Sequence, residues 1–149
     1  MRNGLKAFKD KFKVEDLTIY ETEHWVWSLR PHQATLGSGI LSLKRECATF
    51  GELAQEEYGD LYQMIKVIEG SLQELFHYDV INYLMLMMVD KHVHYHVIPR
   101  YKSEREQFDQ VWKDQAWPGL PDLSGEVSES EALCKIASYV KSNLKQVHN

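Results

Sequence analysis

Histidines occupy three alternate positions in the middle of the chain, in the segment His92-Val93-His94-Tyr95-His96. On a β-strand, alternate side chains point to the same face, so the three imidazoles form a row. Histidine is the side chain best able to act as nucleophile, acid or base near neutral pH. A buried row needs partners for up to six ring nitrogens, which a purely structural role hardly explains. The row therefore predicts a reactive site.

Zinc binding is a second chemistry for this row, because strand histidines at i and i+2 can share one ion. On an ideal strand the Cα atoms of His92 and His96 lie about 13 Å apart, so three rings reach one ion only by leaning inward. A two-histidine site completed by His24, His32 or an acidic side chain stays open as an alternative.

Five segments have the composition and alternation of strands, at 17–20, 25–29, 39–44, 80–89 and 92–98. The first two flank a short polar turn, which predicts a hairpin. The fourth is apolar at nearly every position, so we expect it to be buried on both faces. The fifth carries the histidines, and Pro99 is expected to end its pairing because proline has no N–H to donate.

Two capping-box patterns predict helix starts. Thr49 with Glu52 opens a long helix whose apolar stripe consists of Leu61, Ile65, Ile68, Leu72 and Leu75. Ser128 with Glu131 opens a closing helix whose apolar face consists of Leu133, Ile136, Val140 and Leu144. Between the two, Trp112 and Trp117 lie in a polar segment and are expected to close the core.

The N-terminal segment places Leu5, Phe8 and Phe12 at helical spacing among several lysines. It has no apolar core of the kind found in signal peptides. We expect a short amphipathic helix that folds against the domain and does not bind a membrane.

Composition bounds the class of protein. With 149 residues and 44% hydrophobic content, the chain fits one domain with one core. A net charge of -5 argues against a surface that grips nucleic acid, whereas a small anionic ligand is compatible with it. Cys47 and Cys134 form no disulfide or zinc pattern, which fits a reducing cytoplasm, and no segment reaches transmembrane length.

The segment from His92 to Arg100 resembles the signature of the histidine-triad (HIT) superfamily, in which three histidines alternate with apolar residues. The turn and strand at 36–45 and the helix after them resemble the family in order and position. The resemblance covers about residues 17–101 of a single domain, 1–149, and leaves 102–149 as a C-terminal extension. It implies an α+β fold with an antiparallel sheet of about five strands, one long helix and a C-terminal helix.

Members of this superfamily generally hydrolyse or transfer nucleoside monophosphates through a covalent nucleotidyl-histidine. The resemblance implies that His94 attacks the α-phosphorus of a nucleoside phosphoramidate or dinucleoside polyphosphate. His92 and His96 would orient the ring, stabilise charge or pass a proton, and Asn82 would lie near phosphate or ribose. No cofactor or metal is required, although a divalent ion can accompany a polyphosphate substrate. The resemblance also implies a homodimer.

The chain departs from the family just before the histidine row. Many members carry Gly-Gln followed by Ser or Thr there, as donors to phosphate or leaving group, whereas this chain has Met-Met-Val-Asp at 87–90. We expect polar residues that flank the cleft to replace these donors. The candidates are Arg30, Gln33, Lys91 and Arg100, and the apolar candidates for the base pocket are Leu17, Ile19 and Leu29.

Three other functions stay open. A nucleotide-binding module with little turnover is compatible with the missing donors. A metal-dependent hydrolase would use the histidine row as ligands. A DNA-end or RNA-cap processor is disfavoured by the acidic balance and by the absence of an appended nucleic-acid motif.

Overall fold

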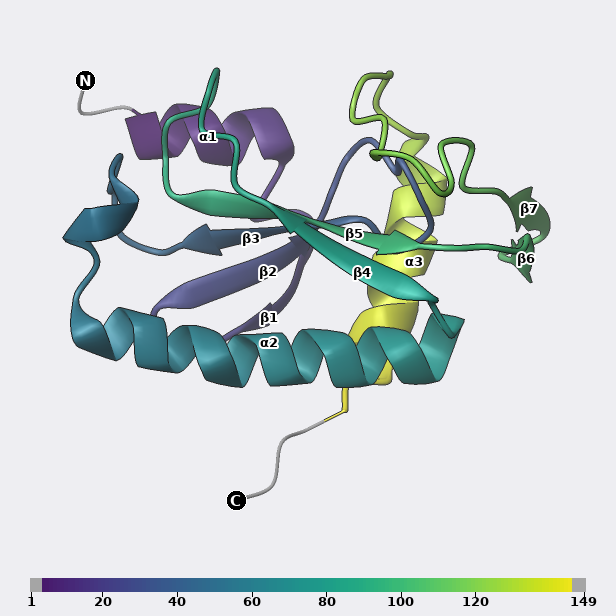
Figure 1. Ribbon diagram of the computed structural model, residues 1–149, viewed down its shortest axis with the longest axis horizontal. Helices are drawn as coiled ribbons and strands as arrows, with labels where there is room; N and C mark the ends of the chain where they lie inside the picture. The colour runs from purple at the N-terminus through teal and green to yellow at the C-terminus, as the bar shows by residue number, and fades with distance from the viewer. Residues whose placement is uncertain (1–3, 146–149) are drawn as a thin grey trace.

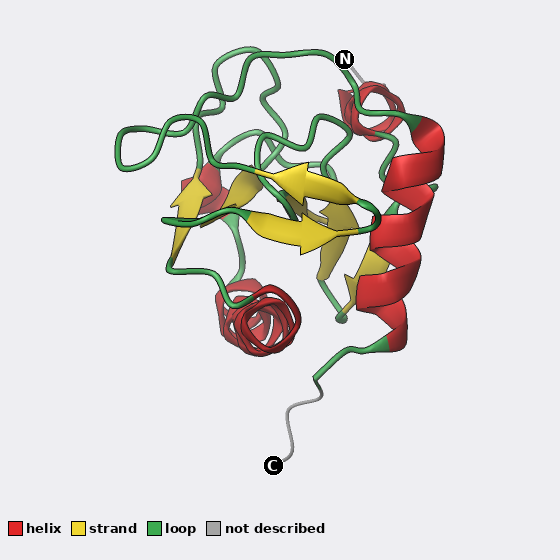
Figure 2. Cartoon of the chain, turned by 90° about the vertical axis from the view of Figure 1, so that its right-hand side faces the viewer, coloured by secondary structure: helices red, strands yellow, loops and turns green. Residues whose placement is uncertain are grey.

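The computed structural model describes residues 4–145 and has helices on both faces of a five-stranded main sheet, with a separate two-stranded sheet, β6-β7 (Figures 1 and 2). In chain order its elements are α1 (Gly4–Phe12), β1 (Thr18–Glu21), β2 (Trp25–Leu29), β3 (Gly39–Leu43), the one-turn helix η1 (Phe50–Glu52), α2 (Gln55–Phe76), β4 (Val80–Leu84), β5 (His94–Arg100), β6 (Arg105–Gln107), β7 (Gln110–Trp112) and α3 (Ser130–Ser142).

The main sheet has five strands in the order β1-β2-β3-β5-β4, and every neighbouring pair is antiparallel. Its two faces are covered differently, because side chains alternate along each strand. Trp25, Trp27 and Leu29 of β2 pack in the main core with α2 and α3. Val26 points to the other face and packs with α1. The expected α+β architecture is confirmed.

The long helix α2 begins later than its capping pattern predicts. Thr49 precedes the one-turn helix η1, and α2 begins at Gln55. Glu57 stabilises this start by accepting a hydrogen bond from the backbone N–H of Ala54 at 2.7 Å. The hydrogen bonds that Arg45 donates to this carboxylate lower the pKa of Glu57 to about 2. The capping box predicted at Thr49 is wrong, because Thr49 precedes the separate one-turn helix η1 and not α2.

The second capping prediction is also wrong. Helix α3 begins at Ser130, and the Ser128 hydroxyl instead accepts a hydrogen bond from the backbone N–H of Gln33 at 3.2 Å. The apolar face of the helix is as expected, with Leu133, Ile136 and Val140 buried in the main core. The C-terminal extension therefore belongs to the same core as the motif-bearing part.

Strand β4 differs from the prediction in length and burial. It ends at Leu84, lies at the edge of the sheet and pairs only with β5. Its side chains are half-buried or exposed, and Leu86, Met88 and Val89 project from the segment that follows. An apolar run does not distinguish an edge strand from a central one, so the expectation of burial on both faces is wrong.

Strand β5 continues through Pro99 to Arg100, so the expectation that Pro99 ends its pairing is wrong. Pro99 pairs with Ile81 of β4, while the pairing of β5 with β3 has already ended at Val97. Proline is tolerated here because β5 has a neighbour on one side only at this point. Arg100 then forms a buried ion pair with Asp114, 2.7 Å from Nε to Oδ2, which fixes the start of the C-terminal segment.

Among the described helices, none is long and apolar enough to cross a membrane. Cys47 is buried, Cys134 is exposed, and neither forms a disulfide. The cytoplasmic location expected from these cysteines stays a prediction. Trp112 is partly buried against the main core, as expected, whereas Trp117 lines a cavity beside Arg100 and is not part of that core.

Candidate active site

The histidine row lies on the α1 face of the sheet. His94 is opposite Ser42, and His96 is opposite Ile40, in the register of β3 with β5. His92 precedes the strand. The three side chains are buried, with 6%, 2% and 7% of their surface exposed in chain order. Their ring nitrogens therefore depend on protein partners, and those partners fix the tautomers.

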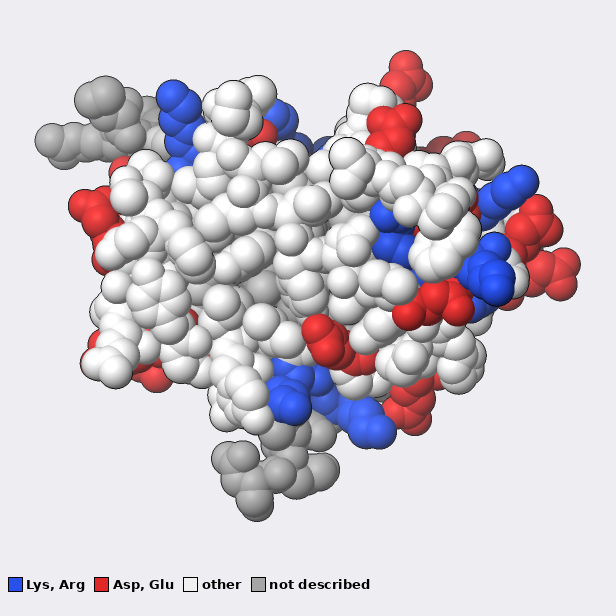
Figure 3. Space-filling model, viewed as in Figure 1, with Lys and Arg blue, Asp and Glu red and all other residues white. Residues whose placement is uncertain are grey.

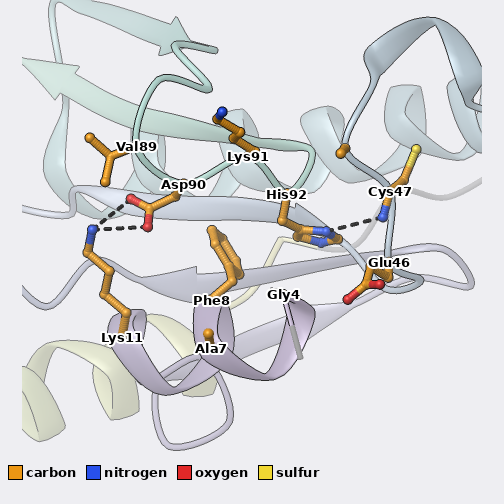
Figure 4. Close-up of a pocket in the computed structure, with 11 residues that line it drawn as sticks. Gly4, Ala7, Phe8, Lys11, Glu46, Cys47, Val89, Asp90, Lys91 and His92 are labelled. Atoms are coloured by element: carbon orange, nitrogen blue, oxygen red, sulfur yellow. Dashed lines mark hydrogen bonds and ion pairs between the residues drawn. The ribbon is translucent and has the colours of Figure 1, made fainter. Parts of the chain in front are cut away.

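Both ring nitrogens of His92 form hydrogen bonds with backbone groups. Its Nε2–H donates to the carbonyl of Leu43 at 2.7 Å, and its Nδ1 accepts from the N–H of Cys47 at 3.4 Å (Figure 4). Burial lowers the pKa of His92, so the ring stays neutral at pH 7. His92 is thereby a fixed bridge between two neighbouring segments, and its own carbonyl is held in place for the next histidine.

His94 is oriented by that carbonyl. Its Nδ1 is hydrogen-bonded to the backbone oxygen of His92, and because a carbonyl can only accept, Nδ1 carries the proton. The other nitrogen, Nε2, then presents a lone pair. Burial lowers the pKa of His94, which keeps this lone pair unprotonated near neutral pH. The ring has the protonation state that a nucleophile requires.

His96 has the opposite arrangement. Its Nδ1 accepts a hydrogen bond from Nε–H of Arg30 at 3.1 Å, so the proton lies on Nε2. Burial, reinforced by the positive charge of Arg30, lowers the pKa of His96 to about 4. The ring is therefore a neutral hydrogen-bond donor toward the cavity and a poor source of a full proton.

Arg30 is a buried cation whose charge is not matched by a carboxylate. Its guanidinium also donates to the carbonyls of His32 and Leu123, at 3.0 and 3.2 Å. Among residues 4–145, no acidic side chain forms an ion pair with it. Burying an unpaired charge is costly, so the site electrostatically favours an anion beside His96.

Helix α1 lies over the histidines. The Phe8 ring is 5.0 Å from the ring of His92 and 4.8 Å from that of His94, centre to centre. Phe12 is 6.0 Å from both His94 and His96. Together with Val14, Val26 and Ile40, the two phenylalanines form a small second core. The amphipathic helix expected at the N-terminus is confirmed, and it covers the histidine row.

Two cavities lie beside α1, and Lys11, Val89 and Asp90 line both of them. The histidine cavity, about 330 Å³, is lined by Lys11, Phe12, Arg30, residues 86–90, His94, His96 and Leu123. The Cys47 cavity, about 430 Å³, is lined by Gly4, Ala7, Phe8, Lys11, residues 46–48 and residues 89–92 (Figure 4). Both volumes are in the range of small-molecule sites.

Several predicted contacts lie elsewhere. The amide of Gln33 donates to the carbonyls of Arg30 and Ser38 and accepts from Gly37, which closes the loop before β3. Asn82 accepts from Arg100, beyond the histidine cavity. Direct substrate contacts by these two residues stay predictions. The base-pocket candidates Leu17, Ile19 and Leu29 are wrong, because they pack in the main core on the opposite face of the sheet.

His24 and His32 do not join the row. The backbone N–H of His24 donates to Asp60 near the start of α2, and the ring of His32 contacts the carbonyl of Glu126. Within residues 4–145, no group of three or more His, Cys, Asp or Glu side chains is arranged to hold a metal ion.

Sequence reasoning missed Phe8, Phe12 and Lys11 as site residues. Their helical spacing predicted an apolar helix face, but spacing alone does not say which surface that face covers. The lysine looked like one of several solvated charges.

The HIT domain model matches residues 11–103, which include the whole histidine row and all five strands of the main sheet. The chain belongs to the HIT family. A histidine triad protein from Sinorhizobium meliloti 1021 has a similar structure, with a TM-score of 0.69 and 20% identity over 89% of this chain and 93% of the other. One from Marinobacter aquaeolei VT8 has a TM-score of 0.67 and 21% identity over 89% and 92%.

A third HIT-like structure is a diadenosine triphosphate hydrolase from Plasmodium falciparum, with a TM-score of 0.63 and 15% identity over 84% of this chain and 74% of that one. These identities are low, so the three structures establish the fold alone. No curated protein sequence matches the chain significantly. As a HIT protein, the chain has a function related to nucleotides, and its substrate and mechanism must be inferred from the site.

Proposed function

We propose that this protein is a nucleotide hydrolase or nucleotidyl transferase that attacks an α-phosphorus with Nε2 of His94. The observation that carries the proposal is the bond from Nδ1–H of His94 to the His92 carbonyl, which leaves the lone pair on Nε2. A ring fixed in this way replaces one difficult displacement by two easier ones. His92 acts as a positioning residue.

In the first step a bond forms between Nε2 of His94 and the α-phosphorus, and the bond from phosphorus to the leaving group breaks. In the second step water attacks the same phosphorus, the N–P bond breaks, and the water proton that is lost passes to solvent or buffer. Nε2–H of His96 donates a hydrogen bond to a non-bridging oxygen, and the charge of Arg30 behind it favours the developing negative charge.

The same arrangement favours one class of leaving group. An amine leaves a phosphoramidate only after it gains a proton, whereas a phosphate leaves an anhydride as a stable anion. His96 cannot readily supply a proton while Arg30 holds its Nδ1. We therefore favour dinucleoside polyphosphates over nucleoside phosphoramidates. A divalent ion bound to the polyphosphate belongs to the substrate.

Metal-ligand chemistry has less support, because both ring nitrogens of His92 are occupied by backbone groups and have no lone pair to offer. One observation favours a binding module with little turnover. His94 is 2% exposed and the Phe8 ring packs against it, so little of the nucleophile faces the cavity. This alternative shares the nucleotide site and differs only in turnover.

Turnover of a substrate panel tests the proposal. We expect dinucleoside polyphosphates to be cleaved at the α-phosphorus with a kcat/KM at least about tenfold above that of nucleoside phosphoramidates. Enzyme stripped with chelator and returned to magnesium alone should keep its activity, whereas a zinc-dependent hydrolase would not. Nucleotide binding without cleavage of any panel member would support the binding module instead.

We also propose that the protein forms a homodimer through β4. This edge strand has unpaired backbone groups, and the face around it carries few charges (Figure 3). Exposed edge strands readily pair with another chain. Light scattering should give about twice the chain mass of 17.5 kDa. Replacing the exposed Val80 and Leu86 together by lysine should shift the protein toward the monomer. A wild type that is monomeric at micromolar concentration would refute this proposal.

A further inference from the structure

We infer that Lys11 of α1 is the phosphate-binding residue that takes the place of the donors missing at positions 87–90. The inference rests on the proposed function, because it names a substrate contact of the same site. It explains how a HIT protein that carries Met-Met-Val-Asp before the row can still hold an anionic ligand.

The position of Lys11 supports this role. Its Nζ donates to both oxygens of Asp90, at 3.0 and 2.8 Å, directly beside the cavity that contains His94 and His96. Lys11 also lines the Cys47 cavity (Figure 4), so its side chain borders both spaces available to a substrate. Asp90 belongs to the segment where other family members have their donors. Lys11 thus brings a donor to that place from a different element.

The charge balance of the histidine cavity supports the same conclusion. Its charged lining residues are Lys11, Arg30 and Asp90, which sum to one positive charge while the histidines are neutral. An α-phosphate bound through two ester or anhydride bonds carries one negative charge and would neutralise it. Burial is the main cause that lowers the pKa of His94 and of His96; the charge of Lys11 lowers both further, and that of Asp90 opposes it.

Lys11 is better suited than Arg30 to exchange partners. Arg30 is buried and its guanidinium is committed to His96 and two carbonyls. The side chain of Lys11 is 51% exposed and has one carboxylate partner, Asp90, although an ammonium has three donors. When phosphate enters, Lys11 can turn from Asp90 to a phosphate oxygen. Lys11 therefore pairs with Asp90 when the site holds no phosphate and with phosphate when it does.

Calorimetric titration of the variants with AMP and GMP tests this inference, because these nucleotides carry the phosphate but cannot be turned over at an anhydride bond. We expect Lys11→Met to weaken binding by about tenfold or more and Lys11→Arg to stay within about threefold of wild type. Asp90→Asn should tighten binding, because it removes the competing carboxylate. Lys6→Met is the matched control, since Lys6 pairs with Asp10 on the exposed side of α1.

The opposite changes in affinity expected for Lys11→Met and Asp90→Asn distinguish phosphate binding from a purely structural ion pair. If the ion pair only holds α1 in place, Lys11→Met and Asp90→Asn break the same contact and shift affinity in the same direction, and this result would overturn the inference. Unchanged affinity of Lys11→Met would also overturn it while leaving the proposed function intact. If the wild type binds neither nucleotide, both the proposed function and this inference fail.

Discussion

Replacing His94 with alanine is expected to lower kcat/KM by at least about 10⁴-fold on whichever panel substrate the wild type cleaves best. The loss is large because no other ring nitrogen in the row can substitute. Those of His92 are both occupied, and that of His96 facing the cavity carries a proton. Binding of the product nucleotide should change only a few-fold. Steady-state kinetics and calorimetry on the same preparation measure both quantities.

A matched control for this variant is His24→Ala, which removes a half-buried histidine near the start of α2. It should retain activity within about twofold, as expected for a site remote from the chemistry. Activity of His94→Ala above about one-tenth of wild type would show that this ring is not the nucleophile.

Replacing Arg30 with methionine is expected to lower kcat by about 10²-fold and to raise the pH at which His96 is protonated. Burial and then the charge of Arg30 lower the pKa of His96 to about 4, so removing the charge raises that pKa. As pH falls, protonation at Nδ1 of His96 then occurs earlier in the variant, and the midpoint of the His96 titration, followed by NMR, moves up by about one unit. The other groups whose charges act on His96, namely Lys11, Asp90 and His94, are unchanged.

The His96 titration distinguishes this role from a merely structural one. Loss of folding would remove the native His96 signal, whereas loss of the Arg30 charge moves its titration midpoint. Arg30→Lys should keep part of the downward shift, because it keeps the positive charge without the planar guanidinium. Lys66→Met on α2 serves as the surface control. A His96 midpoint that stays at the wild-type pH in Arg30→Met would mean that Arg30 does not control His96.

The histidine row could be predicted from sequence because two simple rules coincide there. Side chains of a strand alternate, and three imidazoles on one face need a chemical reason. Arg30 could also be predicted, because it directly follows a strand that lines the cleft. The strands and the apolar faces of α2 and α3 followed from periodicity, which depends only on local spacing.

What the sequence could not show depends on contacts distant along the chain. The face of α1 was predictable, but its packing on His92, His94 and His96 follows from the tertiary arrangement. Gln33 looked like a ligand donor, yet its amide closes its own loop. The apolar run that contains β4 looked central and lies at an edge, because an apolar run alone does not distinguish an edge strand from a central one.

The central claim is a covalent nucleotidyl-histidine at position 94, and rapid quenching followed by intact-mass and peptide mass spectrometry tests it directly. With the best panel substrate, wild-type protein is expected to gain the mass of one nucleotidyl group. That group should be released by acid, as expected of an N–P bond, and should map to the peptide that contains His94. An adduct on another residue, or cleavage at full rate with no adduct at any quench time, would contradict the account.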